Sequence, residues 1–381
     1  MKLQPLLLLA FFLMCHSKGE EYLYPVGFLQ EKDKNVSLFL LYQKSLQHLE
    51  LWQWNPTTGI AHKALMSSYT PAGLRMLPNN KGFSFIDEGS LRIKYFDKRS
   101  PGTIDFPYPI YDFHTIEWID EKHAVFSAKK EDVFCIFIVH AQHRTAHCLI
   151  DIPECDCMYP QFLNNELFFI MRKKNQEFCI VKTSIVLEQY DQDLLASNEE
   201  IIKNPIIKPV IILQENAIAF LHMSSPTEGY FMEHPRFVSR REPALQFNCY
   251  RIQYSHDSWN KELLFPCAIP MRYLIDGSGT RLYESILPFL PRYTEGAIFF
   301  MHGDQSDTTA IYCYNTRTKA ISATSNTPEK RDSISLFGPL DCNDQIFYGG
   351  EVNPKNESPI FQMEENGSLR VSLPHRPKMF T

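Results

Sequence analysis

The sequence predicts an all-β fold, a single β-propeller of about seven four-stranded blades, with six blades as the alternative count. Short apolar segments recur along the chain at nearly regular intervals, which indicates a repeat architecture. Aromatic residues make up 13% of the 381 residues, and their large flat side chains favour pleated strands. Helical periodicity is almost absent, because only residues 184–196 have a spacing compatible with a helix.

The repeat is marked by seven short segments that share one local pattern, a strand followed by a polar turn. The central residues of these segments are separated by 42, 42, 44, 70, 64 and 47 residues. Four of these six intervals fall in the range of about 40 to 50 residues that is typical of four-stranded propeller blades. The seven segments are Leu49–Trp52, Leu91–Lys94, Phe134–Phe137, Phe178–Val181, Asn248–Arg251, Tyr312–Asn315 and Pro359–Gln362.

Two of the intervals are longer, and each contains an insertion. The first insertion, Val186–Asn204, is polar and acidic and includes Asp191. The second, Ser224–Pro243, is rich in Pro, Arg and Ser, and we expect little strand structure there. Insertions at turns are where such folds usually differ from one another and carry function.

Each marked segment follows a more apolar strand. A continuous apolar run is typical of a strand buried on both faces, so we expect these strands to lie between neighbouring sheets. Asn pairs such as Asn164-Asn165 precede some of them, and Asn tolerates the positive φ of a tight hairpin turn. The strands after the marked segments are mixed in polarity, as expected at an outer edge. The apolar strands are Gly82–Ile86, Ala124–Ser127, Leu167–Ile170, Ala217–Leu221, Ala297–Met301 and Gln345–Tyr348.

This unit resembles the repeat of TolB-like propellers, a WD40-like (PD40) family. The likeness rests on a polar turn, an apolar strand, a strand of the Ile-Tyr type and a following Asn/Asp-x-x-Thr/Gly turn, and it extends over Leu38–Pro374. Asn80–Phe85 stands where that family usually has Ser-Pro-Asp-Gly and an apolar strand, although no unit keeps the Ser-Pro-Asp-Gly turn. The resemblance implies a propeller, an exported location and a TolB-like role in the cell envelope.

Residues 1–19 are predicted to be a signal peptide, which leaves residues 20–381 as the propeller domain. Lys2 supplies the positive start, Leu6–Met14 supplies the apolar core, and small residues follow from Ser17 onwards. The apolar run is too short to remain as a membrane anchor, and no later segment is long and apolar enough to span a membrane. We therefore expect a periplasmic or secreted protein.

The sequence contains ten cysteines, which raises the question of disulfides in an exported chain. Cys15 leaves with the signal peptide unless it is acylated, in which case the chain would be a lipid-anchored envelope protein. Lipoprotein signals usually have a small residue before this cysteine, and Met14 is large, so removal of Cys15 is favoured. Four further cysteines occupy the same phase of four repeats, where we expect buried thiols rather than bridges. They are Cys135, Cys179, Cys249 and Cys313.

Cys155 and Cys157, with His147 and Cys148 nearby, are weak candidates for a metal site, because thiolate and imidazole suit zinc or copper. The single residue between the two cysteines makes them a poor pair of ligands for one ion. The alternative is a free thiol or a bridge to Cys148 in a turn between two blades.

Histidines are also concentrated, with five in one predicted blade. His140 and His143 bracket a turn at a spacing that occurs in metal sites. The simpler interpretation is that they are turn residues on a solvated rim. The five are His114, His123, His140, His143 and His147.

Composition and motifs argue against several classes of function. The net charge of −6 argues against nucleic-acid binding, which needs a basic surface. The sequence contains no Gly-x-Ser-x-Gly elbow, no glycine-rich phosphate loop and no His-Glu-x-x-His segment. We therefore expect a non-enzymatic protein without a cofactor.

These features predict an exported β-propeller that acts as a protein-binding scaffold. Aromatic and Arg side chains are the usual anchors of protein interfaces, and the second insertion contains several. The alternative is a ligand binder or enzyme, lectin-like or hydrolytic, that uses polar side chains of the inner strands around a central channel. The candidate partner-binding residues are Arg236, Phe237, Arg240 and Arg241.

Overall fold

The fold is all-β in the part of the chain that is described. The computed structural model describes residues 21–30, 36–45, 48–55, 61–67, 72–78, 81–87, 90–96, 101–106, 110–113, 116–175, 177–187, 191, 209–216, 218, 220–233, 236–237, 244–270, 292–294, 297–303, 309–323, 336–342, 345–352, 361–363 and 369–371. The predicted signal peptide, with Cys15, lies outside these residues. Within them, no helix has the length and hydropathy required to cross a membrane.

The chain divides into two compact units. The first consists of Met1–Thr70, Phe237–Gln246 and Cys267–Thr381, and the second consists of Pro71–Arg236 and Phe247–Pro266. Each unit is described by itself below.

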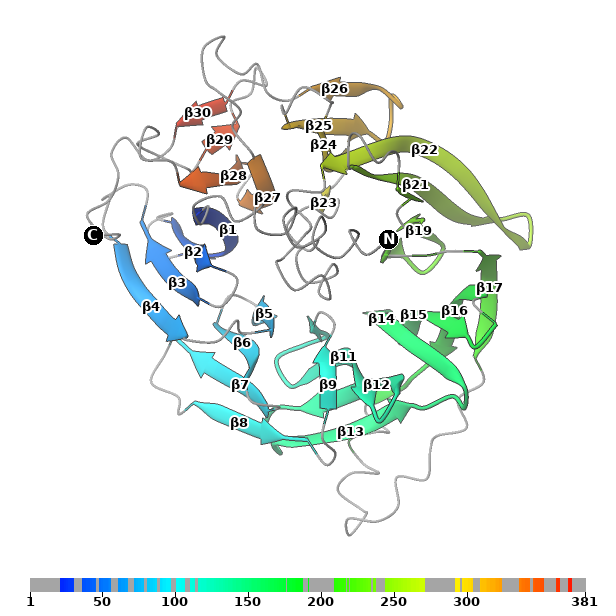
Figure 1. Cartoon of the computed structure of the whole chain (residues 1–381). Coiled ribbons are helices and arrows are strands. Elements are labelled where there is room, and N and C mark those ends of the chain that lie inside the picture. The colour runs from blue at the N-terminus through cyan, green and yellow to red at the C-terminus, as the bar shows by residue number, and fades with distance from the viewer. Residues whose placement is uncertain are drawn as a thin grey trace, which may run out of the picture. The chain divides into compact units, whose positions relative to one another are not determined.

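The second unit contains three antiparallel sheets and most of a fourth (Figure 1). Within these sheets, most strands that are neighbours in the sequence pair with one another. The first sheet contains β5 (Ala72–Met76), β6 (Gly82–Asp87), β7 (Ser90–Tyr95) and β8 (Gly102–Asp105). The second contains β9 (Ile110–Phe113), β10 (Glu117–Trp118), β11 (His123–Lys130), β12 (Val133–His140) and β13 (Thr145–Ile150). The third contains β14 (Cys155–Leu163), β15 (Glu166–Lys173), β16 (Phe178–Ser184) and β17 (Val210–Glu215). The fourth contains β18 (Phe220–Ser225), β19 (Glu228–Met232), β20 (Arg236–Phe237), β21 (Ala244–Ser255) and β22 (Ser258–Pro270).

The remaining strands form two more sheets. One contains β23 (Arg292–Thr294), β24 (Ala297–Gly303), β25 (Thr309–Asn315) and β26 (Ile321–Ala323). The other has eight strands and joins two four-stranded meanders, because β1 pairs with β28 from Glu21↔Val352 to Leu23↔Gly350. Its strands are β1 (Glu21–Gln30), β2 (Val36–Ser45), β3 (His48–Trp54), β4 (Ala61–Ser67), β27 (Leu336–Cys342), β28 (Gln345–Val352), β29 (Phe361–Met363) and β30 (Leu369–Val371).

The predicted fold class, a β-propeller of four-stranded antiparallel blades, is confirmed. The described strands form six sheets, which is the alternative count given by the sequence. The described residues of all seven marked sequence segments fall on the third strand of a four-stranded meander; Pro359 and Ile360 of the seventh lie outside the described residues. The seventh repeat is accounted for by the two meanders of the eight-stranded sheet. The seven third strands are β3, β7, β12, β16, β21, β25 and β29.

The apolar strands of the second unit are buried on both faces, as predicted. On β15, Leu167 and Phe169 pack against β11 and β12 of the preceding sheet. The residues between them, Phe168 and Ile170, pack against β18, β19 and β21 of the following sheet. All four side chains are fully buried. Because successive side chains of a strand point to opposite faces of the sheet, β15 contributes to a hydrophobic core on each side. Each core is stabilised by the removal of apolar surface from water.

One hairpin turn was predicted in detail. Asn164 and Asn165 join β14 to β15, and both have positive φ, 50° and 62°. This is the backbone conformation that a two-residue hairpin turn requires and that Asn tolerates.

The structure corrects the prediction for the second insertion. Little strand structure was expected in Ser224–Pro243, but it contains β19, whose Tyr230 and Phe231 are buried. Ala217–Leu221 was expected to be the second strand of this repeat, whereas β18 begins at Phe220 and is the first. The polar and Pro-containing flanks concealed a five-residue strand with high β-propensity.

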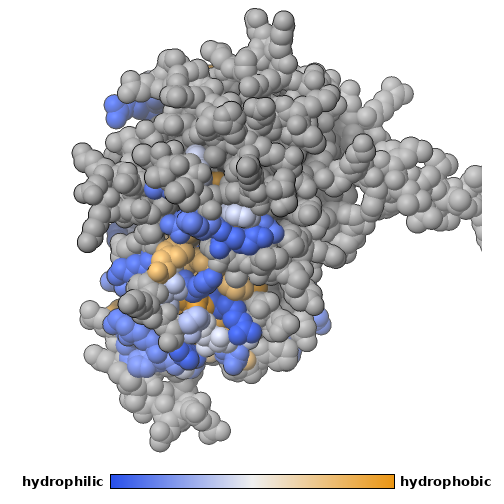
Figure 2. Space-filling model, turned by 90° about the vertical axis from the view of Figure 1, so that its left-hand side faces the viewer, coloured by the Kyte–Doolittle hydropathy of each residue, from blue (hydrophilic) through white to orange (hydrophobic). Residues whose placement is uncertain are grey.

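The coloured surface in Figure 2 is mainly hydrophilic, with a smaller apolar area among the polar residues. Exposed large hydrophobic residues are few in the described segments, and several belong to outer strands such as β17 and β22. Scattered apolar residues of this kind are normal on a folded protein.

Candidate functional site

Four polar side chains of the second unit come from edge strands of four successive sheets. Arg75 lies on β5, Glu117 on β10, Gln161 on β14 and His222 on β18. All four are half-buried. We call them the edge-strand cluster.

Gln161 connects three of these sheets through its side-chain amide. Its Oε1 accepts a hydrogen bond from the backbone N–H of Met223. Its Nε2 lies 3.3 Å from Nδ1 of His222. The Gln161 side chain also lowers the pKa of the Glu117 carboxyl group by hydrogen bonding. The amide is therefore held in one orientation by groups on both neighbouring sheets.

A β-bulge positions Gln161. The register between β14 and β15 shifts between Met158 and Gln161, and Tyr159 has a φ of 53° at this point. The backbone N–H of Tyr159 donates to Oγ of Ser127 on the preceding sheet, at 3.3 Å. Bulges redirect side chains and are frequent beside functional sites.

Glu117 has the most perturbed carboxyl group of this cluster. Burial raises its pKa from 4.5 to about 7. Hydrogen bonds from the Phe162 backbone and from Gln161, together with the charge of Arg75, lower the pKa but do not outweigh burial. Near neutral pH this carboxyl group can accept hydrogen bonds as the anion or donate one as the acid. Strongly perturbed ionisable groups of this kind concentrate at functional sites.

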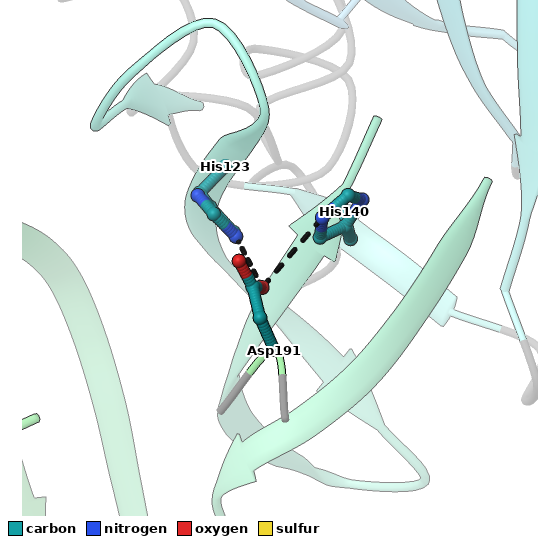
Figure 3. Close-up of side chains that lie close together, drawn as sticks. All are labelled: His123, His140 and Asp191. Carbon is teal, nitrogen blue, oxygen red and sulfur yellow. Dashed lines mark hydrogen bonds and ion pairs between the residues drawn. The ribbon is translucent and has the colours of Figure 1, made fainter. Parts of the chain in front are cut away.

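A second polar group, the histidine cluster, consists of His123, His140 and Asp191 (Figure 3). Nε2 of His123 lies 2.8 Å from Oδ1 of Asp191, and Nε2 of His140 lies 3.6 Å from the same oxygen. Both histidines are buried, which corrects the expectation that His140 is a solvated rim residue, whereas His143 is exposed as expected. These three residues are one of two groups, among the described residues, with three potential metal-ligand atoms within 4.8 Å of one another.

The other such group is Cys135, Cys148 and Asp151. The sulfur of Cys148 is a hydrogen-bond partner of Cys135 and raises the pKa of the Cys135 thiol, with burial adding to the effect. The expected buried thiols are present at Cys135, Cys179 and Cys249, whereas Cys313 is half-buried. The eight cysteines whose side chains are described are free thiols.

The predicted metal ligands Cys155, Cys157 and His147 belong to neither group of three. The two cysteines lie on β14, where Cys157 is fully buried in the core between two sheets and burial raises the pKa of its thiol. His147 lies on β13, and burial lowers its pKa. A metal at these residues stays a prediction.

The predicted partner-binding residues are described only in part. Arg236 and Phe237 form the short strand β20, which pairs with β21, whereas Arg240 and Arg241 lie outside the described residues. Their role also stays a prediction.

The edge-strand cluster was not identified from the sequence. Arg75, Glu117 and Gln161 pair with Ser84, Val125 and Phe168, which follow them by 9, 8 and 7 residues. Alignment of the repeats on the second strand, followed by a search for polar residues upstream of it, would have found these three.

Comparison with known proteins reveals similarity of fold but not of sequence. No protein-family model matches the chain, and no curated protein matches it in sequence. A puromycin-hydrolysing peptidase of Mycobacterium tuberculosis aligns with 93% of this chain at 9% identity and a TM-score of 0.56. The tricorn protease aligns with 81% of it at 9% identity and a TM-score of 0.50. A putative TolB from Agrobacterium tumefaciens aligns with 65% of this chain and 88% of its own, at 13% identity and a TM-score of 0.39.

The likeness to the two proteases and the six antiparallel sheets place this chain among β-propeller proteins. The chain spans 54% of the peptidase and 35% of the tricorn protease. At these identities the comparison establishes the fold alone, since one propeller fold supports many functions.

Proposed function

We propose that this chain is an exported, non-catalytic β-propeller module that binds a protein partner through the edge-strand cluster. The export proposal rests on the three regions of a signal peptide in residues 1–19. The binding proposal rests on one observation, the Glu117 carboxyl group with a pKa of about 7 beside Arg75 and Gln161.

The chemistry of the cluster suits a peptide segment. Arg75 offers a cation that can bind a carboxylate, and Glu117 can bind a cation as the anion or a carbonyl oxygen as the acid. In a β-propeller the sheets surround a central channel, and edge strands that begin successive sheets are close enough to contact one ligand together. A few fixed polar groups of this kind give a binding site its specificity.

Selection of peptides from a displayed random library tests the proposal. We expect the purified chain to enrich peptides whose binding is weakened at least tenfold by Glu117→Gln and by Arg75→Met. The matched control is Asp132→Asn in the exposed β11–β12 turn, which leaves binding unchanged. Failure to enrich any peptide, or equal binding by all variants, would contradict the proposal.

An enzyme is the second candidate, because a carboxyl pKa near neutral suits a general acid or base. Mass spectrometry of the selected peptides after incubation separates the two functions. A binding module returns the peptide intact, whereas a hydrolase returns fragments and loses this activity in Glu117→Gln.

Export is tested separately by the mature N-terminus. We expect cleavage after the small residues that follow Met14, which removes Cys15. An acylated Cys15 would instead identify the chain as a lipid-anchored envelope protein.

A further inference from the structure

The histidine cluster is assembled mainly by one hairpin. His123 is the first residue of β11 and His140 is the last residue of β12, and the two are register partners. Partners in an antiparallel pair have Cβ atoms roughly 5 Å apart, so the open end of the hairpin brings both imidazoles together. Their ring centroids are 4.8 Å apart and their planes are almost perpendicular, at 88°. In Figure 3 the carboxylate of Asp191 points towards both rings.

The spacing of the three polar atoms is close to that of metal ligands. Zinc binds nitrogen and carboxylate oxygen at about 2.0–2.1 Å, so ligand atoms in a tetrahedral site are about 3.3 Å apart. The two distances to Oδ1 of Asp191, 2.8 Å and 3.6 Å, lie on either side of that value. The three atoms all lie within 4.8 Å of one another, so small movements of the side chains would place them around one ion.

A carboxylate also fixes the orientation of the His123 ring. Asp120 lies 2.9 Å from Nδ1 of His123 through Oδ2 and 3.0 Å through Oδ1. Its Oδ1 accepts backbone N–H groups of Lys122 and His123 as well, each at 2.7 Å. A carboxylate that accepts a hydrogen bond from Nδ1–H leaves the lone pair of Nε2 to bind a metal, which is the usual arrangement around metal-binding histidines.

Burial and charge suit a divalent cation. Asp120 and Asp191 place two carboxylates beside the rings, and a divalent ion can compensate their negative charge. The His140 and His123 side chains are 2% and 3% exposed, whereas Asp191 is 29% exposed and offers a route for the ion to enter.

We propose that His123, His140 and Asp191 bind one divalent transition-metal ion, with Zn²⁺ as the best match. Two imidazoles and one carboxylate are typical zinc ligands, and they leave a fourth tetrahedral position for water. Calcium and magnesium prefer oxygen ligands throughout, so this donor set disfavours them. His140 Nδ1 accepts the backbone N–H of His143 at 3.1 Å, so coordination through Nε2 moves the ring proton to Nδ1 and releases this bond.

Zn²⁺ titration of the metal-free full chain, with a chromogenic chelator as competitor, tests the proposal. We expect one tightly bound Zn²⁺ that depends on the cluster. Asp120→Asn should weaken the affinity roughly 10- to 100-fold, as is typical for carboxylates behind a ligand. Asp191→Asn should weaken it further. The control Asp257→Asn changes an exposed turn residue and should bind like the wild type.

Substitution by Co²⁺ identifies the ligands. The proposal requires the visible absorption of a tetrahedral site without a thiolate charge-transfer band, and Cys148→Ser must retain full binding. A thiolate band, or loss of binding in Cys148→Ser, would assign the metal to Cys135 and Cys148 and overturn the proposal. Absence of Zn²⁺ binding, or equal binding by Asp120→Asn, Asp191→Asn and the wild type, would overturn it too. If Asp191→Asn does not fold, Asp120→Asn decides, since Asp120 lies half-buried at the periphery.

Discussion

The edge-strand cluster and the histidine cluster share the sheet β9–β13, but they are assembled in different ways. The edge-strand cluster takes one half-buried residue from each of four sheets, and Gln161 connects three of them. The histidine cluster takes two buried residues from one hairpin and adds Asp191 from the connection that follows β16.

This difference separates what each cluster depends on. The edge-strand cluster depends on how successive sheets of the second unit pack, so a change in packing should alter its hydrogen bonds. The histidine cluster depends on the register of β11 and β12 and on the contacts of both rings with Asp191. Perturbations of one cluster should therefore leave the other nearly unchanged, as is usual for sites that share no partners.

The largest expected effect is a pH-dependent difference in unfolding free energy between Glu117→Gln and the wild type. The pKa of Glu117 is raised from 4.5 to about 7, so the folded state binds a proton that the unfolded state has lost. Below pH 4.5 the Glu117 carboxyl group is protonated in both the folded and the unfolded state, so its raised pKa costs no stability. As the pH rises towards 7, the carboxyl group loses its proton first in the unfolded state, and the folded state becomes less stable. A pKa difference of 2.5 corresponds to about 3 kcal/mol. Above pH 7 the unfolding free energy of Glu117→Gln should therefore exceed that of the wild type by up to this amount.

Urea denaturation at pH values below 4.5 and above 7 measures this difference. Glu131→Gln, in the exposed turn after β11, should show no such pH dependence. A pH-independent difference between Glu117→Gln and the wild type would mean that the Glu117 carboxyl group titrates normally.

The next largest effect is expected from a packing change that should alter the edge-strand cluster and leave the histidine cluster unchanged. A Cβ atom on Gly229 would lie 2.4 Å from Sδ of Met223 and 2.9 Å from the carbonyl oxygen of His222. Gly229→Ala therefore forces β18 and β19 apart and should cost roughly 1–3 kcal/mol of unfolding free energy. Gly102→Ala is the control, because its Cβ would meet Ile93 at an ordinary 3.5 Å.

NMR titration of Glu117 and chemical shifts of His123 can follow both clusters in Gly229→Ala. We expect the Glu117 pKa to change and the His123 signals to remain in place. Equal disturbance of both would show that the two clusters are coupled.

A smaller effect is expected from the histidine cluster. Asp191→Asn removes a charged hydrogen-bond acceptor from two buried imidazoles and should cost roughly 1–2 kcal/mol in metal-free protein. Chemical denaturation with a chelator present measures this loss, and the Glu117 pKa should stay near 7. A neutral result would mean that solvent replaces Asp191 without cost.

The sequence predicted the fold well because the signals that specify the fold lie in short stretches of neighbouring residues. Strand periodicity, turn residues and the repeat interval identified third strands throughout the chain, and they predicted the positive φ of Asn164 and Asn165. The strand β19 was missed because only five residues carry its pattern, within a segment rich in Pro and Arg.

The sites were less accessible from the sequence for a physical reason. His123 and His140 were among five histidines assigned to one blade, but the sequence paired His140 with His143, and the shared partner Asp191 lies 68 residues after His123. The edge-strand cluster depends on contacts between sheets, and no local pattern reports how Gln161 reaches Glu117 and His222.

The smallest effect, expected for Gln161→Leu, tests whether this amide joins the sheets. Leu keeps the volume but cannot accept the backbone N–H of Met223 or donate to Glu117. Because water can replace part of these bonds at a half-buried site, the loss of stability should be about 1 kcal/mol. The Glu117 pKa should rise above about 7, since the Gln161 hydrogen bond lowers it. Gln214→Leu on the exposed strand β17 is the control, and an unchanged Glu117 pKa in Gln161→Leu would show that the sheets do not communicate through Gln161.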